Sequence, residues 1–456
     1  MSILTELPAT LKKAIRRHNV PGASVAVLRN GRVTAAAAGV LNVETKVTST
    51  TDSVFQIGSI SKVFTTTLVM QLVDDGLVDL DAPLQHYLPD FQTLDAKASR
   101  SATVRQLLCH TSGIEGDLFV DSGRGEDCVA RLQDMGRLLP QLFPPGERLS
   151  YCNFGFAMLG RMLEVVTGSN YDELLRTRVF EPLQMNHALS LPEDCVKYRC
   201  AIGHVPHPKK PGQQLLSPMP WLSQGQKAAG ATPSMSAPDL LSFVAMHLRG
   251  GRSSDGQRIL SASSVRAMQR QQHRLPTGAR LGVSAWGLGW YMDNWAGSKV
   301  FGHDGGTVGQ YSFLRVLPKQ QLAMVLLTNG GDAGGLYEEL FNGVFAKLGR
   351  IQLPTLPEPM QRIPADLAGL CGRYENLTGT IEVSGASDKL KVAVTPKPGL
   401  LAGLNITRAP VRVLSRNVLQ FDSDNPQLAR TTLAFDGDED GQPQFVNMGM
   451  RLYRRC

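Results

Sequence analysis

Ser59 and Lys62 lie three positions apart in the segment Gly58-Ser59-Ile60-Ser61-Lys62 and could act as a nucleophile and its base. An apolar-periodic stretch from Ser59 to Asp75 is followed by Gly76, which predicts a helix with a glycine cap. Residues at this spacing share one helix face, about 5 to 6 Å apart at Cβ. A lysine desolvated among apolar neighbours can lose its charge and activate a serine, and the amide donors at a helix start favour the developing alkoxide. The spacing alone also fits an N-capped helix with an exposed lysine.

A second segment places Tyr151 and Asn153 two positions apart, shortly after Pro144-Pro145-Gly146 and at the start of a helical pattern that extends to Thr167. Side chains two apart on a loop before a helix can point into one cleft. A phenol can relay a proton to a leaving group, and an amide can hold a substrate carbonyl and a lysine together. The alternative is a core tyrosine beside a helix-capping asparagine.

A third segment, Phe301-Gly302-His303-Asp304-Gly305-Gly306-Thr307, precedes a strand-like stretch, Gln310 to Leu317. A hydrogen-bonding side chain followed by glycines lets a ligand backbone approach closely and offers an amide donor to it. A histidine in such a place can equally be structural.

The order and spacing of the three segments resemble the serine β-lactamase and penicillin-binding-protein superfamily, whose signature is Ser-x-x-Lys, then Tyr-x-Asn, then Lys-Thr-Gly or a His-x-Gly equivalent. More narrowly, the chain resembles the class C β-lactamase-like group, which contains DD-peptidases, D-aminopeptidases, family VIII carboxylesterases and penicillin-binding-protein-type thioesterases. The resemblance covers roughly Leu11 to Leu348. Four flanking segments share it: Phe55 to Ser59, Leu107 to Gly113, Phe154 to Gly160 and Gly287 to Trp290.

The resemblance implies a role for each residue of the three motifs. Ser59 would be the acylated nucleophile and Lys62 its base. Tyr151 would shuttle a proton, and Asn153 would position Lys62 and bind the substrate amide. His303 would assist Tyr151 or hold a substrate carboxylate.

It also implies that the backbone amides of Ser59 and Gly306 form an oxyanion hole. Gly305 and Thr307, together with Asn153, would bind substrate. His110, in a His-Thr-Ser-Gly turn, is expected to be structural. No metal and no cofactor are implied.

The implied function is serine acyl hydrolysis through a covalent acyl-enzyme on Ser59, with an ester or a D-configured amide or peptide as substrate. One alternative is acyl transfer, including peptide macrocyclisation as in the penicillin-binding-protein-type thioesterases. Another is a weak β-lactamase or a non-catalytic penicillin-binding homologue. His303 stands where class C enzymes have a lysine that binds the acidic group of β-lactams, and a neutral imidazole holds an anion poorly. Efficient β-lactamase activity is therefore not expected.

The pattern around the motifs predicts the elements that position them. An N-terminal helix is followed by two apolar runs around Arg29-Asn30-Gly31, a hairpin signal. Helical patterns cover 104–109, 151–167, 237–249 and 335–348, and strand-like runs begin at about Trp286. The resemblance implies a mixed α/β (α+β) β-lactamase-like fold, in which helices flank an antiparallel sheet and an all-α subdomain is added.

A proline-rich stretch, residues 351–366, looks like a linker between a hydrolase domain (1–350) and a C-terminal domain (367–456). Short alternating runs in the C-terminal domain predict a small antiparallel β-barrel or sandwich, and the segment resembles the lipocalin-like barrel of some relatives. Such a domain could restrict which acyl chains enter, or could simply stabilise or dimerise the protein.

Composition sets further limits. Of 456 residues, 42% are hydrophobic and 19% charged, which is typical of a globular protein of two or three domains. The net charge of +7 is thinly spread, the densest basic cluster being Arg451 with Arg454 and Arg455, so nucleic-acid binding is not expected. The seven cysteines match no zinc pattern and are expected to be free thiols.

The N-terminal segment lacks the apolar core of a secretory signal, and no window reaches the roughly 18 uncharged apolar residues of a spanning helix. We therefore expect a cytoplasmic protein that does not contact membranes. Its expected partner is a small-molecule or peptide acyl substrate, and a homo-oligomer is left open.

Overall fold

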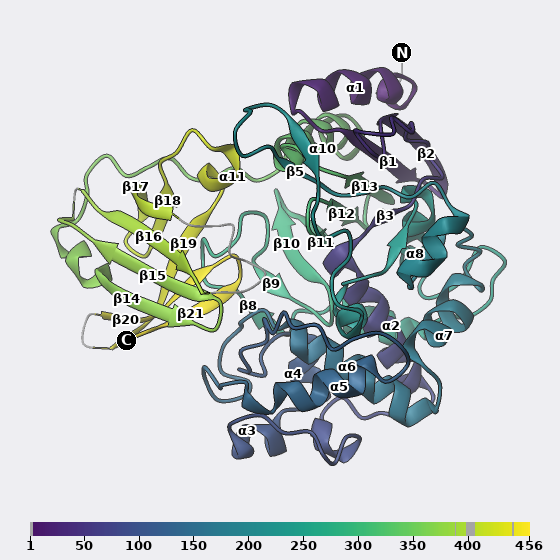
Figure 1. Ribbon diagram of the computed structural model, residues 1–456, viewed down its shortest axis with the longest axis horizontal. Helices are drawn as coiled ribbons and strands as arrows, with labels where there is room; N and C mark the ends of the chain where they lie inside the picture. Colours follow the sequence, from purple (N-terminus) through teal and green to yellow (C-terminus); the bar gives the residue numbers. More distant parts are fainter. Residues whose placement is uncertain (1–2, 388, 398–405, 440–441) are drawn as a thin grey trace.

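The computed structural model describes residues 3–387, 389–397, 406–439 and 442–456. A larger body of helices around a sheet occupies one side of the molecule, and a β-barrel built from the C-terminal part of the chain occupies the other (Figure 1). This arrangement confirms the predicted fold class: a β-lactamase-like mixed fold followed by an antiparallel barrel.

The sheet of the body contains eight antiparallel strands within the described residues. In spatial order they are β2 (Arg32–Gly39), β1 (Gly22–Arg29), β13 (Leu322–Thr328), β12 (Tyr311–Leu317), β11 (Ser298–Gly306), β10 (Tyr291–Trp295), β9 (Ala285–Trp286) and β8 (His273–Arg274). The predicted hairpin joins β1 and β2, with Arg29 opposite Arg32. Asn30 and Gly31 both have positive φ, as a tight two-residue hairpin turn requires.

The two faces of this sheet belong to different hydrophobic clusters. Along β1, Val25 and Val27 pack in the cluster that includes α1 (Ile3–Arg17) and α10 (Ala333–Val344), whereas Ala26 and Leu28 pack in the larger cluster on the opposite face. This alternation follows from the two-residue period of a strand that is buried on both sides.

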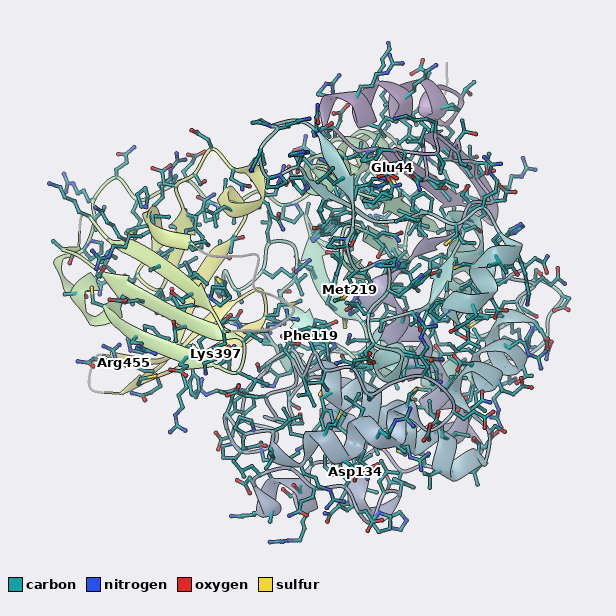
Figure 2. All side chains as sticks on the ribbon, viewed as in Figure 1. Glu44, Phe119, Asp134, Met219, Lys397 and Arg455 are labelled. Atoms are coloured by element: carbon teal, nitrogen blue, oxygen red, sulfur yellow. The ribbon has the colours of Figure 1, made fainter. Side chains whose placement is uncertain are left out.

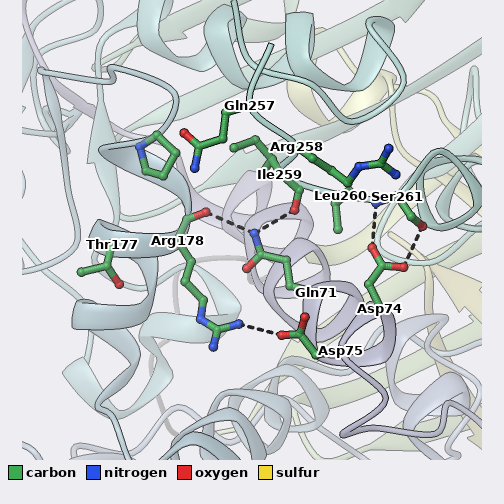
Figure 3. A pocket seen from close by; sticks show the side chains of 11 residues that line it. Gln71, Asp74, Asp75, Thr177, Arg178, Gln257, Arg258, Ile259, Leu260 and Ser261 are labelled. Carbon is green, nitrogen blue, oxygen red and sulfur yellow. Dashed lines mark hydrogen bonds and ion pairs between the residues drawn. The ribbon is translucent and has the colours of Figure 1, made fainter. Parts of the chain in front are cut away.

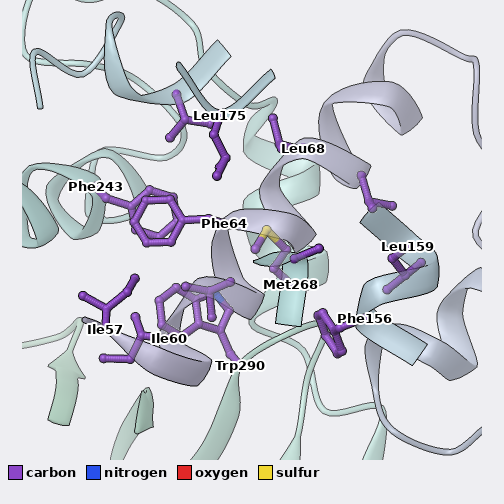
Figure 4. Packing of buried hydrophobic residues seen from close by; sticks show 14 of the residues in the cluster. Ile57, Ile60, Phe64, Leu68, Phe156, Leu159, Leu175, Phe243, Met268 and Trp290 are labelled. Atoms are coloured by element: carbon purple, nitrogen blue, oxygen red, sulfur yellow. The ribbon is translucent and has the colours of Figure 1, made fainter. Parts of the chain in front are cut away.

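The larger cluster is formed mainly by helices that cover the second face of the sheet. Its central helix, α2 (Ser61–Asp74), is buried almost all round, and the ring of Phe64 stacks on that of Phe243 at 4.0 Å between centroids (Figure 4). The other helices of the body are α3 (Ala96–Ser101), α4 (Val104–Leu108), α5 (Cys128–Met135), α6 (Asn153–Thr167), α7 (Tyr171–Leu175), α8 (Ala237–Leu248) and α9 (Ala262–Met268). A three-stranded sheet orders β3 (Phe55–Gln56), β7 (Ser234–Met235) and β4 (Ala188–Leu189), and β5 (His204–Pro206) pairs with β6 (Gln214–Leu216).

Three predicted helix starts lie two residues from the observed ones. The expected helix at Ser59 begins as a short 3-10 turn, Gly58–Ile60, before α2 starts at Ser61. The expected helix at Tyr151 begins at Asn153, so Tyr151 lies on the loop that enters α6. The last helix, predicted to start at Gly335, starts at Ala333 (α10) and continues into a π-helical turn, Phe345–Gly349.

The C-terminal part forms a closed antiparallel barrel of eight strands, counted over its described residues. They are β14 (Gly372–Asn376), β15 (Gly379–Ser384), β16 (Lys391–Pro396), β17 (Ile406–Ser415), β18 (Val418–Phe421), β19 (Thr432–Glu439), β20 (Gln442–Met448) and β21 (Arg451–Arg455), with a short helix, α11 (Pro426–Ala429), between β18 and β19. β21 pairs with β14 and closes the barrel. This confirms the predicted antiparallel barrel and is consistent with the lipocalin-like resemblance.

The barrel contacts the body through polar pairs and through two apolar clusters, in which side chains of both parts pack together. Arg148 of the body forms an ion pair with Asp436 of the barrel, and the carboxylate of Glu115 accepts a hydrogen bond from the backbone amide of Leu377. Lys397 lies at the side of the barrel nearest the body (Figure 2). Residues 351–364, all of them described, contain no helix or strand, in keeping with the linker we propose there.

None of the described helices is both long enough and apolar enough to pass through a membrane.

Candidate active site

Ser59 lies in the short 3-10 turn between β3 and α2 and is half-buried. The preceding backbone is tied to the main sheet, since the carbonyl oxygen of Ile57 accepts a hydrogen bond of 2.7 Å from the hydroxyl of Ser312 on β12. A Cβ atom on Gly305 of β11 would lie only 1.9 Å from the same carbonyl oxygen. The glycine therefore allows β11 to approach the turn that carries Ser59. The sequence predicted close approach of a ligand backbone here, whereas the neighbour at Gly305 is the protein's own backbone.

Lys62 is fully buried in the first turn of α2, and its amine lies among three oxygen atoms. Its Nζ is 3.1 Å from Ser59 Oγ, 2.7 Å from Asn153 Oδ1 and 2.6 Å from the carbonyl oxygen of Ala229. Burial lowers the pKa of Lys62 well below its ordinary value, and the positive charge of Arg451 lowers it further.

The hydrogen-bond partners of Lys62 indicate how a neutral amine would be arranged. A neutral amine has two N–H donors and one lone pair. Asn153 Oδ1 and the carbonyl of Ala229 can only accept, so they take both donors. The lone pair is then left for Ser59, whose hydroxyl can donate to it. In this arrangement Lys62 can accept the serine proton.

Asn153, the first residue of α6, is held in one orientation by Asp117. Its Nδ2 donates to Asp117 Oδ1 at 2.6 Å, and an ionised carboxylate can only accept. The amide nitrogen must therefore face Asp117, which turns Oδ1 toward Lys62. The start of α6 is fixed in addition by the thiol of Cys152, which accepts from the amide of Gly155 at 3.2 Å.

Tyr151 lies beside Lys62, whose Nζ is 4.8 Å from the centre of the phenol ring. Burial raises the pKa of Tyr151, opposed by Ser59 and Arg451, so the phenol is protonated at neutral pH. Its hydroxyl has no hydrogen-bond partner among the described residues: Ser59 is near enough to affect the pKa but is not in hydrogen-bond geometry. The phenol is thus a free proton donor beside the serine.

His303 lies within β11, and its ring centre is 6.4 Å from that of Tyr151. Burial, helped by the charge of Lys62, lowers the pKa of His303 to about 3. The neutral ring donates from Nδ1 to the carbonyl oxygen of Asp304 at 2.6 Å, which leaves Nε2 as an acceptor without a partner in the described part of the chain. A neutral imidazole is better suited to accept a hydrogen bond from Tyr151 than to bind an anion.

The remaining predicted residues lie on the same strand end. Gly306 is exposed, and its amide nitrogen lies close to Gly58: a Cβ on Gly58 would come within 2.5 Å of it. The amide of Gly306 is therefore next to the turn of Ser59, where an oxyanion hole would need it. Thr307 has a buried hydroxyl that no described residue satisfies.

His110, predicted to be structural, is buried and stacks on Tyr151 at 4.2 Å between ring centroids. Its Nδ1 accepts from the amide of Cys152 at 3.0 Å, so the ring supports the segment that carries Tyr151 and Asn153.

Sequence reasoning missed three contributors to the site: Asp117, Ala229 and Arg451. Asp117 lies on a loop without a motif, and Arg451 lies on β21 of the barrel, where it forms an ion pair with Asp117. The only signal was the basic cluster near the C-terminus, which the sequence does not connect to the motifs.

A surface pocket of about 310 Å³ lies elsewhere, at the opposite end of α2 (Figure 3). Gln71 donates there to the carbonyl oxygens of Arg178 and Ile259 at 3.1 Å each, and Asp74 accepts from the amide and the hydroxyl of Ser261. The donors of Gln71 and the carboxylate of Asp74 are thus occupied, and no residue of the three motifs lines the pocket.

A helix-flanked antiparallel sheet with a serine, a lysine, a tyrosine, an asparagine and a histidine gathered at one place defines the class of β-lactamase-like serine hydrolases. The Beta-lactamase family matches residues 7–342 of the chain. The protein therefore belongs to the Beta-lactamase family, which confirms the superfamily that the motifs predicted.

The chain is also similar to individual proteins. It is 40% identical to penicillin-binding protein 4 of Amycolatopsis lactamdurans over 367 residues, which cover 79% of this chain and 95% of that one. The crystal structure of SurE matches with a TM-score of 0.79 and 26% identity over 99% of both chains, and a match to SurE with D-Leu has a TM-score of 0.77. The D-amino acid amidase of Ochrobactrum anthropi SV3, complexed with D-phenylalanine, matches with a TM-score of 0.61 and 25% identity over 72% of this chain and 93% of that one.

Proposed function

We propose that this protein is a serine acyl hydrolase that forms a covalent ester on Ser59 and cleaves an ester or a D-configured amide. The observation that carries the proposal is the arrangement around Lys62, where two acceptors occupy the N–H donors of a neutral amine and the third neighbour is Ser59 Oγ. That arrangement supports proton transfer from the serine to the lysine during attack.

In the acylation step, Ser59 Oγ attacks the substrate carbonyl carbon, and its proton passes to Lys62 Nζ. The carbonyl oxygen becomes an oxyanion, which the backbone amides of Ser59 and Gly306 stabilise. Tyr151 then gives its proton to the leaving amine or alcohol as the bond to the carbonyl carbon breaks. Tyr151 regains a proton from Lys62, so the lysine returns to its neutral form.

Hydrolysis of the ester reverses this sequence with water as the nucleophile. Tyr151 passes its proton to Lys62 and takes a proton from the attacking water, and Lys62 returns its proton to Ser59 Oγ as the ester bond breaks. The raised pKa of Tyr151 and the neutral state of His303 fit these roles, since the phenol starts protonated and the imidazole can accept a hydrogen bond from it.

The preference for a D-configured substrate rests on the solved relatives. SurE has been crystallised with D-Leu, and a D-amino acid amidase with D-phenylalanine. Both have this fold, and the first matches over nearly the whole chain, barrel included. We therefore propose an acyl group with a D-configured residue next to the bond that is cleaved.

Mass spectrometry of the intact protein tests the proposal. The protein is incubated with a panel of p-nitrophenyl esters, D- and L-amino acid amides, peptidyl thioesters and penicillins. We expect an acyl adduct on Ser59 that appears with the esters and the D-configured substrates and decays in water. Faster decay with an added amine, giving an amide product, would favour acyl transfer instead, and a stable penicillin adduct would favour a penicillin-binding role.

Ser59→Ala should abolish every adduct. Ser61→Ala is the matched control, because Ser61 is a neighbouring buried serine whose hydroxyl has no hydrogen-bond partner in the described residues. Adducts that persist in Ser59→Ala would overturn the proposal.

A further inference from the structure

The tip of one barrel hairpin lies against the second catalytic segment. β20 and β21 are joined by Gly449 and Met450, with Met448 opposite Arg451. Both loop residues have positive φ, which a tight two-residue turn needs and which methionine rarely adopts. Two hydrogen bonds hold Met450 there: its amide donates to Asn447 Oδ1 at 3.0 Å, and its carbonyl accepts from the amide of Tyr151 at 2.8 Å.

The next residue of this hairpin, Arg451, reaches into the site. Its guanidinium forms an ion pair with Asp117, whose side chain is only 5% exposed, and lies 5.0 Å from the ring centre of Tyr151. The ion pair joins residues 334 positions apart in the chain. The guanidinium is therefore placed by the fold of the barrel and its partner by the fold of the body.

A continuous series of contacts leads from this ion pair to the nucleophile. Asp117 accepts from Asn153 Nδ2 at 2.6 Å, Asn153 Oδ1 accepts from Lys62 at 2.7 Å, and Lys62 Nζ lies 3.1 Å from Ser59 Oγ. Without a carboxylate at Asp117, the amide of Asn153 could turn over and present its N–H₂ group to Lys62. The lysine would then lose an acceptor, and its lone pair would no longer be directed at the serine.

We propose that Arg451 and Asp117 are positioning residues for the Lys62–Ser59 pair, so that the C-terminal barrel completes the catalytic centre of the body. The proposal rests on the function proposed above. Arg451 holds the carboxylate of Asp117 in place, Asp117 sets the orientation of Asn153, and Asn153 sets the donor and acceptor pattern of Lys62.

The two residues have opposite electrostatic effects on the lysine. The positive charge of Arg451 lowers the pKa of Lys62, and the negative charge of Asp117 raises it. Loss of Arg451 should thus leave Lys62 protonated up to a higher pH, whereas loss of the Asp117 charge should make it deprotonate at a lower pH. A contact that only held the barrel and the body together would not shift the pKa of Lys62 in opposite directions in the two variants.

Other titratable groups surround Lys62 and bear on its titration. They are Asp117, Cys152, Tyr151, His110, His303 and Arg451. Burial lowers the pKa of both histidines, that of His303 to about 3, so they stay neutral while Lys62 titrates. Burial raises the pKa of Cys152 to about 12 and also raises the pKa of Tyr151, so both stay protonated. Arg451 and Asp117 are the charged members of this group.

The experiment compares Arg451→Met, Arg451→Lys and Asp117→Asn with the wild-type full-length protein. The pH dependence of Ser59 acylation by a p-nitrophenyl ester is measured by stopped flow. We expect Arg451→Met to shift the acidic limb to higher pH and Asp117→Asn to shift it to lower pH. Each should slow acylation on the plateau about 10- to 100-fold, because the reacting groups lose their alignment. Arg451→Lys, which keeps the charge, should leave the limb close to its wild-type position.

A second measurement does not depend on turnover. Titration of the Lys62 side chain is followed by NMR of ¹³Cε-labelled lysine, with Lys62→Met used to assign the signal. The midpoint should move up in Arg451→Met and down in Asp117→Asn. If the wild-type protein forms no ester on Ser59, the proposed function fails, but this titration still decides whether Arg451 and Asp117 set the state of Lys62.

Asp436→Asn is the matched control, since Asp436 pairs with Arg148 across the same interface but takes no part in the contacts that link Arg451 to Lys62. It should leave the pH profile and the lysine titration unchanged. Thermal unfolding of each variant shows that the folded state is retained. The proposal is overturned if Arg451→Met and Asp117→Asn move the lysine titration in the same direction or leave it unmoved, or if Asp436→Asn reproduces the effect of Arg451→Met.

Discussion

The carbonyl oxygen of Ala229 lies 2.6 Å from the Nζ atom of Lys62, so a backbone group of the body shares the lysine with Asn153 and Ser59. Ala229 ends a short 3-10 helix, and the next residue, Gly230, has a φ of +115° that turns the chain at this point. The amine of Lys62 is therefore held from two sides, by a side chain of α6 and by a backbone carbonyl.

Replacing Lys62 should abolish activity but increase the stability of the folded protein. Its pKa is lowered in the folded protein, so between that lowered pKa and the ordinary pKa of a lysine the unfolded chain binds a proton that the folded protein does not. The contribution of Lys62 to stability is therefore unfavourable at neutral pH and becomes less so as pH rises toward that ordinary value. We expect Lys62→Met to abolish acylation of Ser59 and to raise the melting temperature, with a larger increase at pH 6 than at pH 9.

Lys227→Met is the matched comparison, because Lys227 is equally buried but pairs with Asp172 at 2.5 Å. Removing the lysine leaves the carboxylate of Asp172 without its partner. Breaking a buried ion pair in this way costs about 3 to 5 kcal/mol, so the melting temperature of Lys227→Met should fall. A fall of similar size in Lys62→Met would contradict the neutral state assigned to Lys62.

A Cβ atom on Gly230 would clash with the backbone of the turn that carries Ser59. It would lie 2.2 Å from the carbonyl oxygen of Gly58 and 2.9 Å from the amide nitrogen of Ser59. We expect Gly230→Ala to displace that amide from its place in the proposed oxyanion hole and to slow acylation about 100-fold or more. Stopped-flow acylation by a p-nitrophenyl ester measures this.

Gly168→Ala controls for backbone strain in that experiment. Gly168 also has positive φ, at the end of α6, but a Cβ atom added to it would meet nothing within 4 Å. It should lower stability by about 1 kcal/mol and leave acylation intact. Equal losses of acylation in both variants would show that strain alone, and not contact with Ser59, is responsible.

The three motifs could be found from the sequence because each keeps its spacing within one local element. Ser59 and Lys62 lie on one helical turn, and Tyr151 and Asn153 lie at the entrance to α6. Local geometry is therefore enough to predict that the two side chains of each pair point to the same side. The structure brings both pairs and His303 together, although their roles remain proposals.

Asp117 and Arg451 could not be found in the same way. They lie on a loop and on a barrel hairpin, and only the docking of the barrel on the body brings them together. A single acidic or basic residue has no period or spacing that marks it. The start of α2 was missed by two residues for a related reason, since the tight packing of Gly58 against Gly306 favours a 3-10 turn there.

The effect of removing the hydroxyl of Tyr151 on the reaction rate should depend on the leaving group of the substrate. In Tyr151→Phe the ring that stacks on His110 remains, and only a hydroxyl without a partner in the described structure is lost. We expect kcat for a D-amino acid amide to fall about 100- to 10,000-fold, because an amine must be protonated as it leaves. Acylation by a p-nitrophenyl ester, whose leaving group needs no proton, should fall far less. Equal losses for the two substrates would argue against proton donation by Tyr151.

His247 should make the protein sensitive to acid. It is buried between the rings of Phe243 and Trp290, and neither ring nitrogen has a hydrogen-bond partner among the described residues. Burial lowers its pKa to about 3. Below the ordinary histidine pKa the unfolded chain binds a proton that the folded protein excludes, so stability falls as pH drops from about 6.5 toward 3.

This residue alone should cost about 2 kcal/mol of unfolding free energy between pH 7 and pH 5. We expect His247→Leu to remove that part of the pH dependence and to stabilise the protein at pH 5, as measured by urea unfolding at the two pH values. His86→Ala, at an exposed position, should leave the pH dependence as it is. An unchanged difference between pH 7 and pH 5 in His247→Leu would mean that the histidine becomes charged, or solvated, within the folded protein.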